Sequence, residues 1–144
     1  MAKIKLKIVT PERIAYEDEI DQATIPTTDG EITILPNHIS LASIIKPGEF
    51  LIKKDGQEIF MAVSGGIIKF DNNELTILAD SAERAEEIDE AKVEEARLRA
   101  VASMAEVTHK DSVEYNQLLG NIERELVRLK VARKRRHHQT TDKL

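Results

Sequence analysis

The chain has 144 residues, 33% of them charged, a formal net charge of −5, and neither cysteine nor tryptophan. This length accommodates one compact domain with an appendage. The absence of cysteine excludes disulfide bonds and thiolate metal sites. The longest apolar stretches, such as residues 59–63, are far shorter than the roughly 20 residues of a membrane-spanning helix. The first residues alternate charged and apolar side chains and contain no signal-peptide core.

The first half of the chain predicts short strands. All four prolines and five of the six glycines lie within the first 66 residues, which is typical of strands joined by tight turns. Residues 3–8 and 30–35 alternate apolar with polar or charged side chains, as half-buried strands do. Asp55-Gly56 and Asp71-Asn72-Asn73 each separate two apolar segments, a pattern typical of hairpin turns. Many short strands at this spacing predict a β-sandwich or flattened barrel.

The second half predicts two helices. Residues 88–107 contain neither glycine nor proline, and their many alanines favour a helix. Asp89 is the expected N-cap, because its carboxylate can accept hydrogen bonds from the first turn. Residues 108–112 interrupt the pattern, and Asp111 or Ser112 can cap the second helix. The fold class is therefore α+β, an N-terminal β-sandwich followed by an antiparallel helical hairpin.

The two helices are expected to face each other through one apolar stripe each. On the second helix the stripe contains Leu118, Ile122, Leu126, Leu129 and Ala132, and on the first Ala91, Leu98, Ala102 and Ala105. Alanine buries little apolar surface, at roughly 25 cal/mol per Å², so the hairpin should dock weakly and be able to move. The predicted organisation is a sandwich at 1–83, a hinge at 84–87, a hairpin at 88–136 and a flexible tail at 137–144.

The modest net charge conceals a strong asymmetry. The first 82 residues carry 8 basic and 13 acidic side chains, whereas the remaining 62 carry 13 of each. Residues 83–95 contain seven acidic side chains against two basic ones, and residues 124–136 contain seven basic side chains against one acidic one. In an antiparallel hairpin these blocks would face each other, with an attraction that salt screens beyond roughly 8–10 Å.

Known catalytic and metal-binding motifs are missing from the sequence. No phosphate-binding P-loop occurs, and Ser64-Gly65 lacks the preceding glycine of a nucleophile elbow. The four histidines, His38, His109, His137 and His138, include no His-x-x-x-His pair that would suggest a metal site. The sequence therefore predicts a protein that is not an enzyme and holds no metal.

Six short motifs of the first half resemble the epsilon subunit of bacterial F-type ATP synthase in order and spacing. They are Thr10-Pro11-Glu12, residues 26–31, residues 34–38, Lys46-Pro47-Gly48, residues 63–66 and residues 77–83. With the two helices that follow, the resemblance covers nearly the whole chain. Asn37 replaces the glycine that is usual in the family's Leu-Pro-Gly-His turn, and asparagine tolerates the same left-handed conformation.

The resemblance implies a non-catalytic rotor subunit of the central stalk. The sandwich would bind the gamma subunit and rest on the ring of c subunits, thereby coupling proton or sodium-ion flow to ATP synthesis. The hairpin would extend toward the alpha and beta subunits and inhibit ATP hydrolysis. The loop that carries Glu31 would lie near the c ring, and His38 would lie near gamma. The chain would be peripheral to the bacterial inner membrane, on its cytoplasmic side, and without a transmembrane segment.

Some members of this family bind regulatory ATP in the folded hairpin through an Ile/Leu-Asp-x-x-Arg-Ala motif and arginines on the second helix. The residues that the resemblance assigns to this site are Glu83, Ile88, Asp89, Lys92, Arg124 and Arg128. Lys92 stands where the motif has arginine, and Val93 where it has alanine. Lysine keeps the charge but loses the bidentate fork, which lowers the affinity roughly 10–100-fold. The sequence therefore predicts no cofactor other than weakly bound ATP.

Each of these residues also has a simpler interpretation. Glu31 can be an ordinary carboxylate at a strand edge, and His38 a solvated turn residue. Asp89 can be an N-cap alone. Arg124 and Arg128 can form a solvated face or pair with the acidic residues 83–95.

Two other functions compete with that of a rotor subunit. The alternative is a nucleic-acid-binding module that uses the basic end of the second helix, residues 133–138. The lack of aromatic residues there and the acidity of the remaining chain argue against it. A stand-alone enzyme built on the sandwich is disfavoured by the missing motifs.

Overall fold

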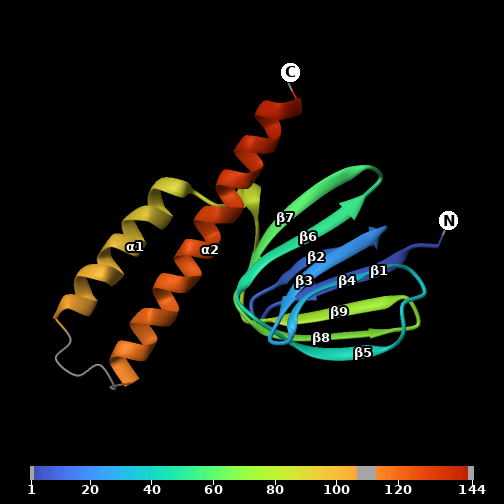
Figure 1. The fold of residues 1–144 in the computed structure, drawn as a ribbon, viewed down its shortest axis with the longest axis horizontal. Helices are drawn as coiled ribbons and strands as arrows, with labels where there is room; N and C mark the ends of the chain where they lie inside the picture. Colours follow the sequence, from blue (N-terminus) through green and yellow to red (C-terminus); the bar gives the residue numbers. More distant parts are fainter. Residues whose placement is uncertain (1, 107–112, 143–144) are drawn as a thin grey trace. The chain divides into compact units, whose positions relative to one another are not determined.

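The computed structural model describes residues 2–106 and 113–142, with side chains up to residue 134. The chain divides into two compact units, Met1–Ala85 and Glu86–Leu144. Strands make up the first unit, and the two long helices lie in the second (Figure 1).

Ten strands occur among the described residues of the first unit. In chain order they are β1 (Ile4–Val9), β2 (Ile14–Ile20), β3 (Gln22–Thr27), β4 (Gly30–Ile34), β5 (Leu41–Ile45), β6 (Gly48–Lys54), β7 (Gln57–Val63), β8 (Gly66–Asp71), β9 (Glu74–Ala79) and β10 (Ala82–Arg84). They are paired in the order β10-β7-β6-β3-β5-β8-β9-β1-β2, and β4 pairs with β3. β1 and β9 run parallel, and the other pairs are antiparallel.

The sheet folds over into two layers around one apolar core (Figure 1). The layers join where Thr27 of β3 pairs with Ile45 of β5. Because successive side chains of a strand point to opposite faces, Ile4, Leu6 and Ile8 of β1 are all buried while Lys5 and Lys7 between them are exposed. The predicted β-sandwich, and the strand alternation over 3–8, are confirmed.

The tight turns have the geometry that their residues favour. Asp55-Gly56 connects β6 to β7 with φ of 50° and 79°, and Asn72-Asn73 connects β8 to β9 with φ of 51° and 60°. Positive φ at both central residues is the hairpin geometry that matches the twist of the strands. Asn37 has a φ of 66°, so asparagine does adopt the left-handed conformation expected at that turn.

Two arginine side chains connect β10, the last strand of the sandwich, with β2 and with the residue that precedes β2. The guanidinium of Arg84, on β10, lies over the ring of Tyr16 of β2 with 4.9 Å between its Cζ and the ring centroid. Arg13 donates a hydrogen bond from Nη2 to the carbonyl of Ala82 at 3.4 Å. The strand β10 is therefore held on two sides, by β7 and by these two arginines. Arg84, which the sequence placed in the hinge, is the last residue of this strand.

The second unit contains the two predicted helices. After the short 3-10 turn η1 (Ala85–Glu87), α1 spans Glu90–Ala105 and α2 spans Val113–Asp142. Asp89 is the N-cap of α1, as predicted, and its Oδ1 accepts hydrogen bonds from the backbone of Ala91 at 3.1 Å and of Lys92 at 3.3 Å. The proposed caps of α2, Asp111 and Ser112, lie outside the described residues. Helix α2 continues to Asp142, because no glycine or proline follows Gly120, and so includes residues 137–142 that the sequence assigned to a tail.

The apolar stripe that the sequence predicted for α1 is wrong. Its members, Ala91, Leu98, Ala102 and Ala105, are exposed, and the less exposed side carries Val93, Ala96, Arg97, Ala100 and Met104. Alanines occur on every side of α1, so their spacing does not define an orientation. On α2 the predicted stripe is confirmed at Leu118, Ile122, Leu129 and Ala132, whereas Leu126 is 48% exposed.

Candidate partner-binding surface

The outer face of one layer carries a continuous row of apolar side chains. Strand pairing aligns them in the order Ile44 (β5), Ile67 (β8), Leu78 (β9), Val9 (β1) and Ile14 (β2). Ile44 is 58% exposed, Ile67 and Ile14 are each 52% exposed, and Leu78 is 47% exposed. This set, the apolar row, crosses five strands on a face where alternation would place polar residues.

Charged residues occupy the next two rows of the same face. The row beside the apolar row, which we call the lysine row, contains Ala42, Lys69, Thr76, Lys7 and Glu17 in strand order. The following row, the acidic row, contains Asp71, Glu74, Lys5 and Glu19. Large apolar side chains gathered beside charged rows are typical of surfaces that bind another protein.

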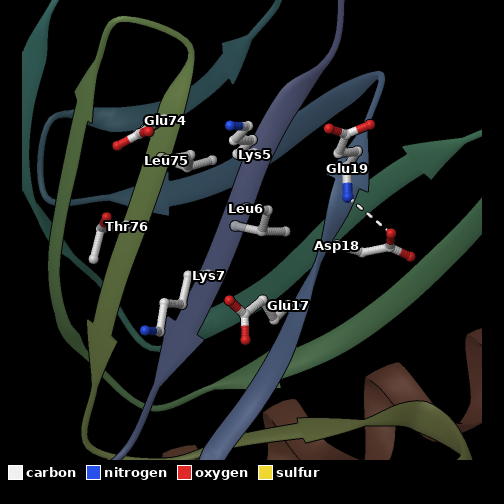
Figure 2. Close-up of a pocket in the computed structure, with 9 residues that line it drawn as sticks. All are labelled: Lys5, Leu6, Lys7, Glu17, Asp18, Glu19, Glu74, Leu75 and Thr76. Carbon is white, nitrogen blue, oxygen red and sulfur yellow. Dashed lines mark hydrogen bonds between the residues drawn. The ribbon is translucent and has the colours of Figure 1, made fainter.

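A shallow bowl of about 420 Å³ lies over β9, β1 and β2, where the lysine row and the acidic row meet. Figure 2 shows Lys5 and Lys7 on β1, with Glu74 and Thr76 on one side and Glu17 and Glu19 on the other. Its charged side chains are exposed and of both signs, with Glu17, Asp18, Glu19 and Glu74 against Lys5 and Lys7. We interpret it as the charged border of the apolar row.

The loop between β4 and β5 is fixed to the β8–β9 turn by side-chain hydrogen bonds. The backbone N–H of Asn37 donates to Oδ1 of Asn73 at 2.6 Å, and Nδ2 of Asn73 donates back to Oδ1 of Asn37 at 3.0 Å. Ser40 donates from its hydroxyl to Oδ1 of Asp71 at 2.6 Å. The asparagine that departs from the family motif therefore gains a partner that glycine could not have.

His38 lies within this fixed loop. Its ring meets the ring of Phe70 edge-on, with 5.9 Å between centroids, and its Nδ1 lies 2.8 Å from the carbonyl oxygen of Ile39. Ile39 itself is 78% exposed. His38 is thus a packed, half-buried part of a loop that presents an apolar side chain to solvent.

Glu31 lies at the other end of β4, next to the β3–β4 turn. It is exposed and pairs in register with Pro26 of β3. A hydrogen bond of 3.0 Å from the backbone of Thr28 to the carbonyl of Ile44 places this turn beside the Ile44 end of the apolar row. Glu31 and His38 therefore lie at opposite ends of β4, and the β3–β4 turn next to Glu31 lies beside the apolar row.

Two of the residues assigned to ATP, Asp89 and Arg128, already have hydrogen-bond partners within the second unit. Asp89 caps α1, and Arg128 donates from Nη1 to Oε2 of Glu125, its helix neighbour, at 2.9 Å. Lys92 and Arg124 are exposed, and Ile88 is 8% exposed. Glu83 lies on β10 of the first unit and is half-buried. In this conformation, ATP would have to compete with the helix terminus and with Glu125.

The opposed charge blocks of the hairpin are reflected in the pKa of one residue. The ion pair with Arg97 lowers the pKa of Glu94, and the positive charge of Arg133 on α2 adds to that effect. Glu94 and Arg97 lie three residues apart on α1. The positive charge of Arg133 on α2 thus acts on one member of the acidic block, Glu94 of α1.

The fold and this surface can be compared with known proteins. Residues 3–85 match the family model described as ATP synthase, Delta/Epsilon chain, beta-sandwich domain. The chain belongs to this family. It is similar to the ATP synthase epsilon chain of Dehalococcoides mccartyi, with 44% identity over 96% of this chain and 98% of that protein. The epsilon chain of Herpetosiphon aurantiacus is 40% identical, over 94% of this chain and 98% of that protein.

Solved structures of the family show the same fold at low identity. A chain of the Euglena gracilis mitochondrial ATP synthase, solved as OSCP/F1/c-ring, has a TM-score of 0.72 and 23% identity, covering 85% of this chain and 77% of that one. A chain of the Tetrahymena thermophila ATP synthase, solved as central stalk and c-ring, has a TM-score of 0.56 and 14% identity, covering 90% and 96%.

Membership of this family makes the chain an epsilon-type, non-catalytic subunit of an F-type ATP synthase. The alternative of a nucleic-acid-binding module is not supported.

Over the described residues, neither helix is long and apolar enough to cross a membrane. Within residues 2–106 and 113–134, whose side chains the structure describes, no cluster of three or more histidine, aspartate or glutamate side chains could bind a metal ion.

The apolar row is the feature that the sequence analysis missed. Its signal was present as pairs of consecutive apolar residues, Val9 after Ile8, Ile44 before Ile45, Ile67 before Ile68 and Leu78 after Ile77. In each pair one side chain enters the core and the other points outward. Such pairs are also compatible with strands buried on both faces, so strand pairing was needed to identify the row.

Proposed function

We propose that this chain is a rotor subunit of the central stalk that couples ion flow through the c ring to ATP synthesis and inhibits ATP hydrolysis. The apolar row would bind the gamma subunit, the β3–β4 turn with Glu31 would meet the c ring, and the loop with His38 would complete the contact with gamma. The hairpin would inhibit hydrolysis when it extends toward the alpha and beta subunits. The chain would then lie on the cytoplasmic face of the bacterial inner membrane.

The observation that carries this proposal is the apolar row itself. Four large aliphatic side chains, aligned across β5, β8, β9 and β2, are about half exposed and lie next to charged rows. A partner that covers these side chains would gain a binding free energy of roughly 25 cal/mol for each Å² of apolar surface removed from water. A rotor subunit needs such a fixed attachment, because it must turn together with its partner.

The test is reconstitution with the catalytic complex that retains gamma but lacks this subunit. Adding the full chain should reduce ATP hydrolysis. Truncation after Ala85, which keeps β10 intact, should retain binding but restore hydrolysis. Ile67→Asp and Leu78→Asp place a charge within the apolar row and should abolish binding, whereas Gln57→Asp, at an exposed strand end, should bind like the wild type.

Three results would contradict the proposal. The full chain could fail to bind the gamma-containing complex, it could bind without changing hydrolysis, or the row variants could bind as tightly as Gln57→Asp. The last result would be compatible with a rotor subunit, but one that binds gamma through a surface other than the apolar row. Folding of each variant is checked by its circular dichroism and thermal transition.

ATP binding to the hairpin should be weak or absent. Lys92 lacks the bidentate fork, and Asp89 and Arg128 already have partners. Isothermal titration of the full chain with ATP measures the affinity directly. Lys92→Arg restores the fork and should raise the affinity roughly 10–100-fold. Submicromolar binding by the wild type would show that the lysine does not matter.

A further inference from the structure

The lysines of the sandwich fall into two groups. Lys3, Lys53 and Lys54 form ion pairs. Lys3 lies 3.0 Å from Asp21 and 2.7 Å from Asp55. Lys53 pairs with Glu58 at 3.9 Å, and Lys54 pairs with Asp18. Lys5, Lys7, Lys46 and Lys69 are exposed and have no ion pair within the residues that the structure describes. Of these four, Lys7 and Lys69 belong to the lysine row, directly beside the apolar row.

The three lysines on the outer face have different cross-strand neighbours. Lys5 lies between Glu74 and Glu19, and Lys7 lies between Thr76 and Glu17. Lys69 lies between Ala42 and Thr76 and has no acidic neighbour in its row. Directly opposed side chains have Cβ atoms about 4.5–5.5 Å apart, so an adjacent carboxylate offsets much of a lysine's charge. The uncompensated positive charge therefore increases from Lys5 through Lys7 to Lys69.

We propose that the segment which covers the apolar row carries acidic side chains along one flank, positioned over Lys69 and Lys7. This inference rests on the proposed function, since it describes the gamma segment that the row would bind. An apolar segment lying on the row would bring its own border within reach of the two lysine ammonium groups. A carboxylate there gains an attractive partner, whereas a basic side chain would meet two like charges.

The acidic row restricts where those carboxylates can lie. It carries three acidic side chains, Asp71, Glu74 and Glu19, against Lys5 alone. A partner carboxylate that reached as far as this row would be repelled, so its acidic flank must stop at the lysine row. Charge of alternating sign in adjacent rows thus fixes the register of the partner across the strands, which the apolar row alone cannot do because its members are all aliphatic.

The experiment measures binding of full-length variants to the gamma-containing complex that lacks this subunit, at low and high salt. Lys69→Glu should weaken binding about tenfold at 50 mM salt and by less than about threefold at 500 mM, because salt screens exposed charge pairs. Lys7→Glu should have a smaller effect, and the double variant a larger one than either. Lys5→Glu is the matched control. It makes the same charge change on β1, the strand that also carries Lys7, and should bind within about twofold of the wild type.

The outcomes separate this inference from the proposed function. If the wild type does not bind, the proposed function fails and the inference with it. If the wild type binds, Ile67→Asp does not, and Lys69→Glu binds as well as the wild type or better, only the inference fails. Equal losses for Lys5→Glu and Lys69→Glu would show a general effect of charge and would also overturn it. Near-unchanged thermal transitions verify that these exposed substitutions leave the sandwich folded.

Discussion

The sandwich and the hairpin differ most in how much apolar surface each buries. Thirteen Phe, Leu, Ile and Met side chains of the described residues are less than 2% exposed, among them Phe50 and Phe70, and all thirteen belong to the sandwich. Among the described residues of the second unit, the buried ones are Ile88, Val93, Leu129, Val131 and Ala132. The sandwich thus has a core sufficient for its own fold, whereas the helices obtain little stability from packing on each other.

Under the proposed function, this difference allows one small chain to combine a fixed attachment with a movable element. The sandwich carries the apolar row and the lysine row on a sheet held by its core, so this surface keeps its shape. The helices of the hairpin bury few side chains among the described residues, and the ion pairs of Glu94 with Arg97 and of Glu125 with Arg128 each lie within one helix. We therefore expect rearrangement of the hairpin to cost less than unfolding of the sandwich.

The largest expected effect breaks the sandwich at Gly66. Its φ of +136° is unfavourable for any other residue, and an added Cβ would lie 2.0 Å from the carbonyl oxygen of Leu78 on β9. Gly66→Ala should therefore destabilise the sandwich by about 4 kcal/mol or more, measured by urea unfolding. Gly56→Ala is the control, since its added Cβ meets nothing within 4 Å, and should cost only about 1–2 kcal/mol for the left-handed backbone.

Equal losses of folding stability for the Gly66 and Gly56 variants would show that the close approach of β8 and β9 at Gly66 does not contribute to the destabilisation.

An intermediate effect is expected at the start of the hairpin. Asp89→Ala removes the acceptor for two backbone N–H groups and should cost about 1 kcal/mol, seen as faster amide hydrogen exchange in the first turn of α1. Asp89→Asn retains an N-cap of similar strength and should exchange like the wild type. Equal exchange in all three proteins would show that the cap contributes nothing to the hairpin.

Sequence reasoning predicted best where local chemistry decides the structure. Strict alternation in β1, the Asp55-Gly56 turn and the Asp89 cap were each recognisable because backbone geometry limits which residues fit. Strands β2, β3, β5 and β10 were not predicted. The alternation of β2 is interrupted by consecutive buried residues at a bulge, and β3 contains Pro26.

The candidate site was less predictable than the fold. Glu31 and His38 were chosen by resemblance alone, and no feature of their own sequence distinguishes a contact residue from a solvated one. The apolar row depends on the pairing of five strands far apart in the sequence, and the orientation of α1 depends on its packing. Both are long-range properties that periodicity within a single segment does not determine.

The smallest expected effect concerns the ion pairs at the edge of the sandwich. The buried core should supply nearly all of the stability of the sandwich, so the loss of one surface ion pair should change that stability only slightly. Ion pairing with Lys54 lowers the pKa of Asp18, and pairing with Lys3 lowers that of Asp21. A carboxylate whose pKa is lower in the folded state stabilises the fold above its unfolded pKa, near 4, and that contribution is lost as the pH falls through the folded value. Asp21→Asn should therefore be slightly less stable than the wild type in urea unfolding at pH 7, and the difference should shrink at pH 3 and in 1 M salt. Asp29→Asn, at the exposed β3–β4 turn, is the control. A difference for Asp21→Asn that stays constant from pH 7 to pH 3 would contradict the assignment of its effect to the ionised carboxylate, which pairs with Lys3 and accepts a hydrogen bond from the backbone of Asp55 at 2.7 Å.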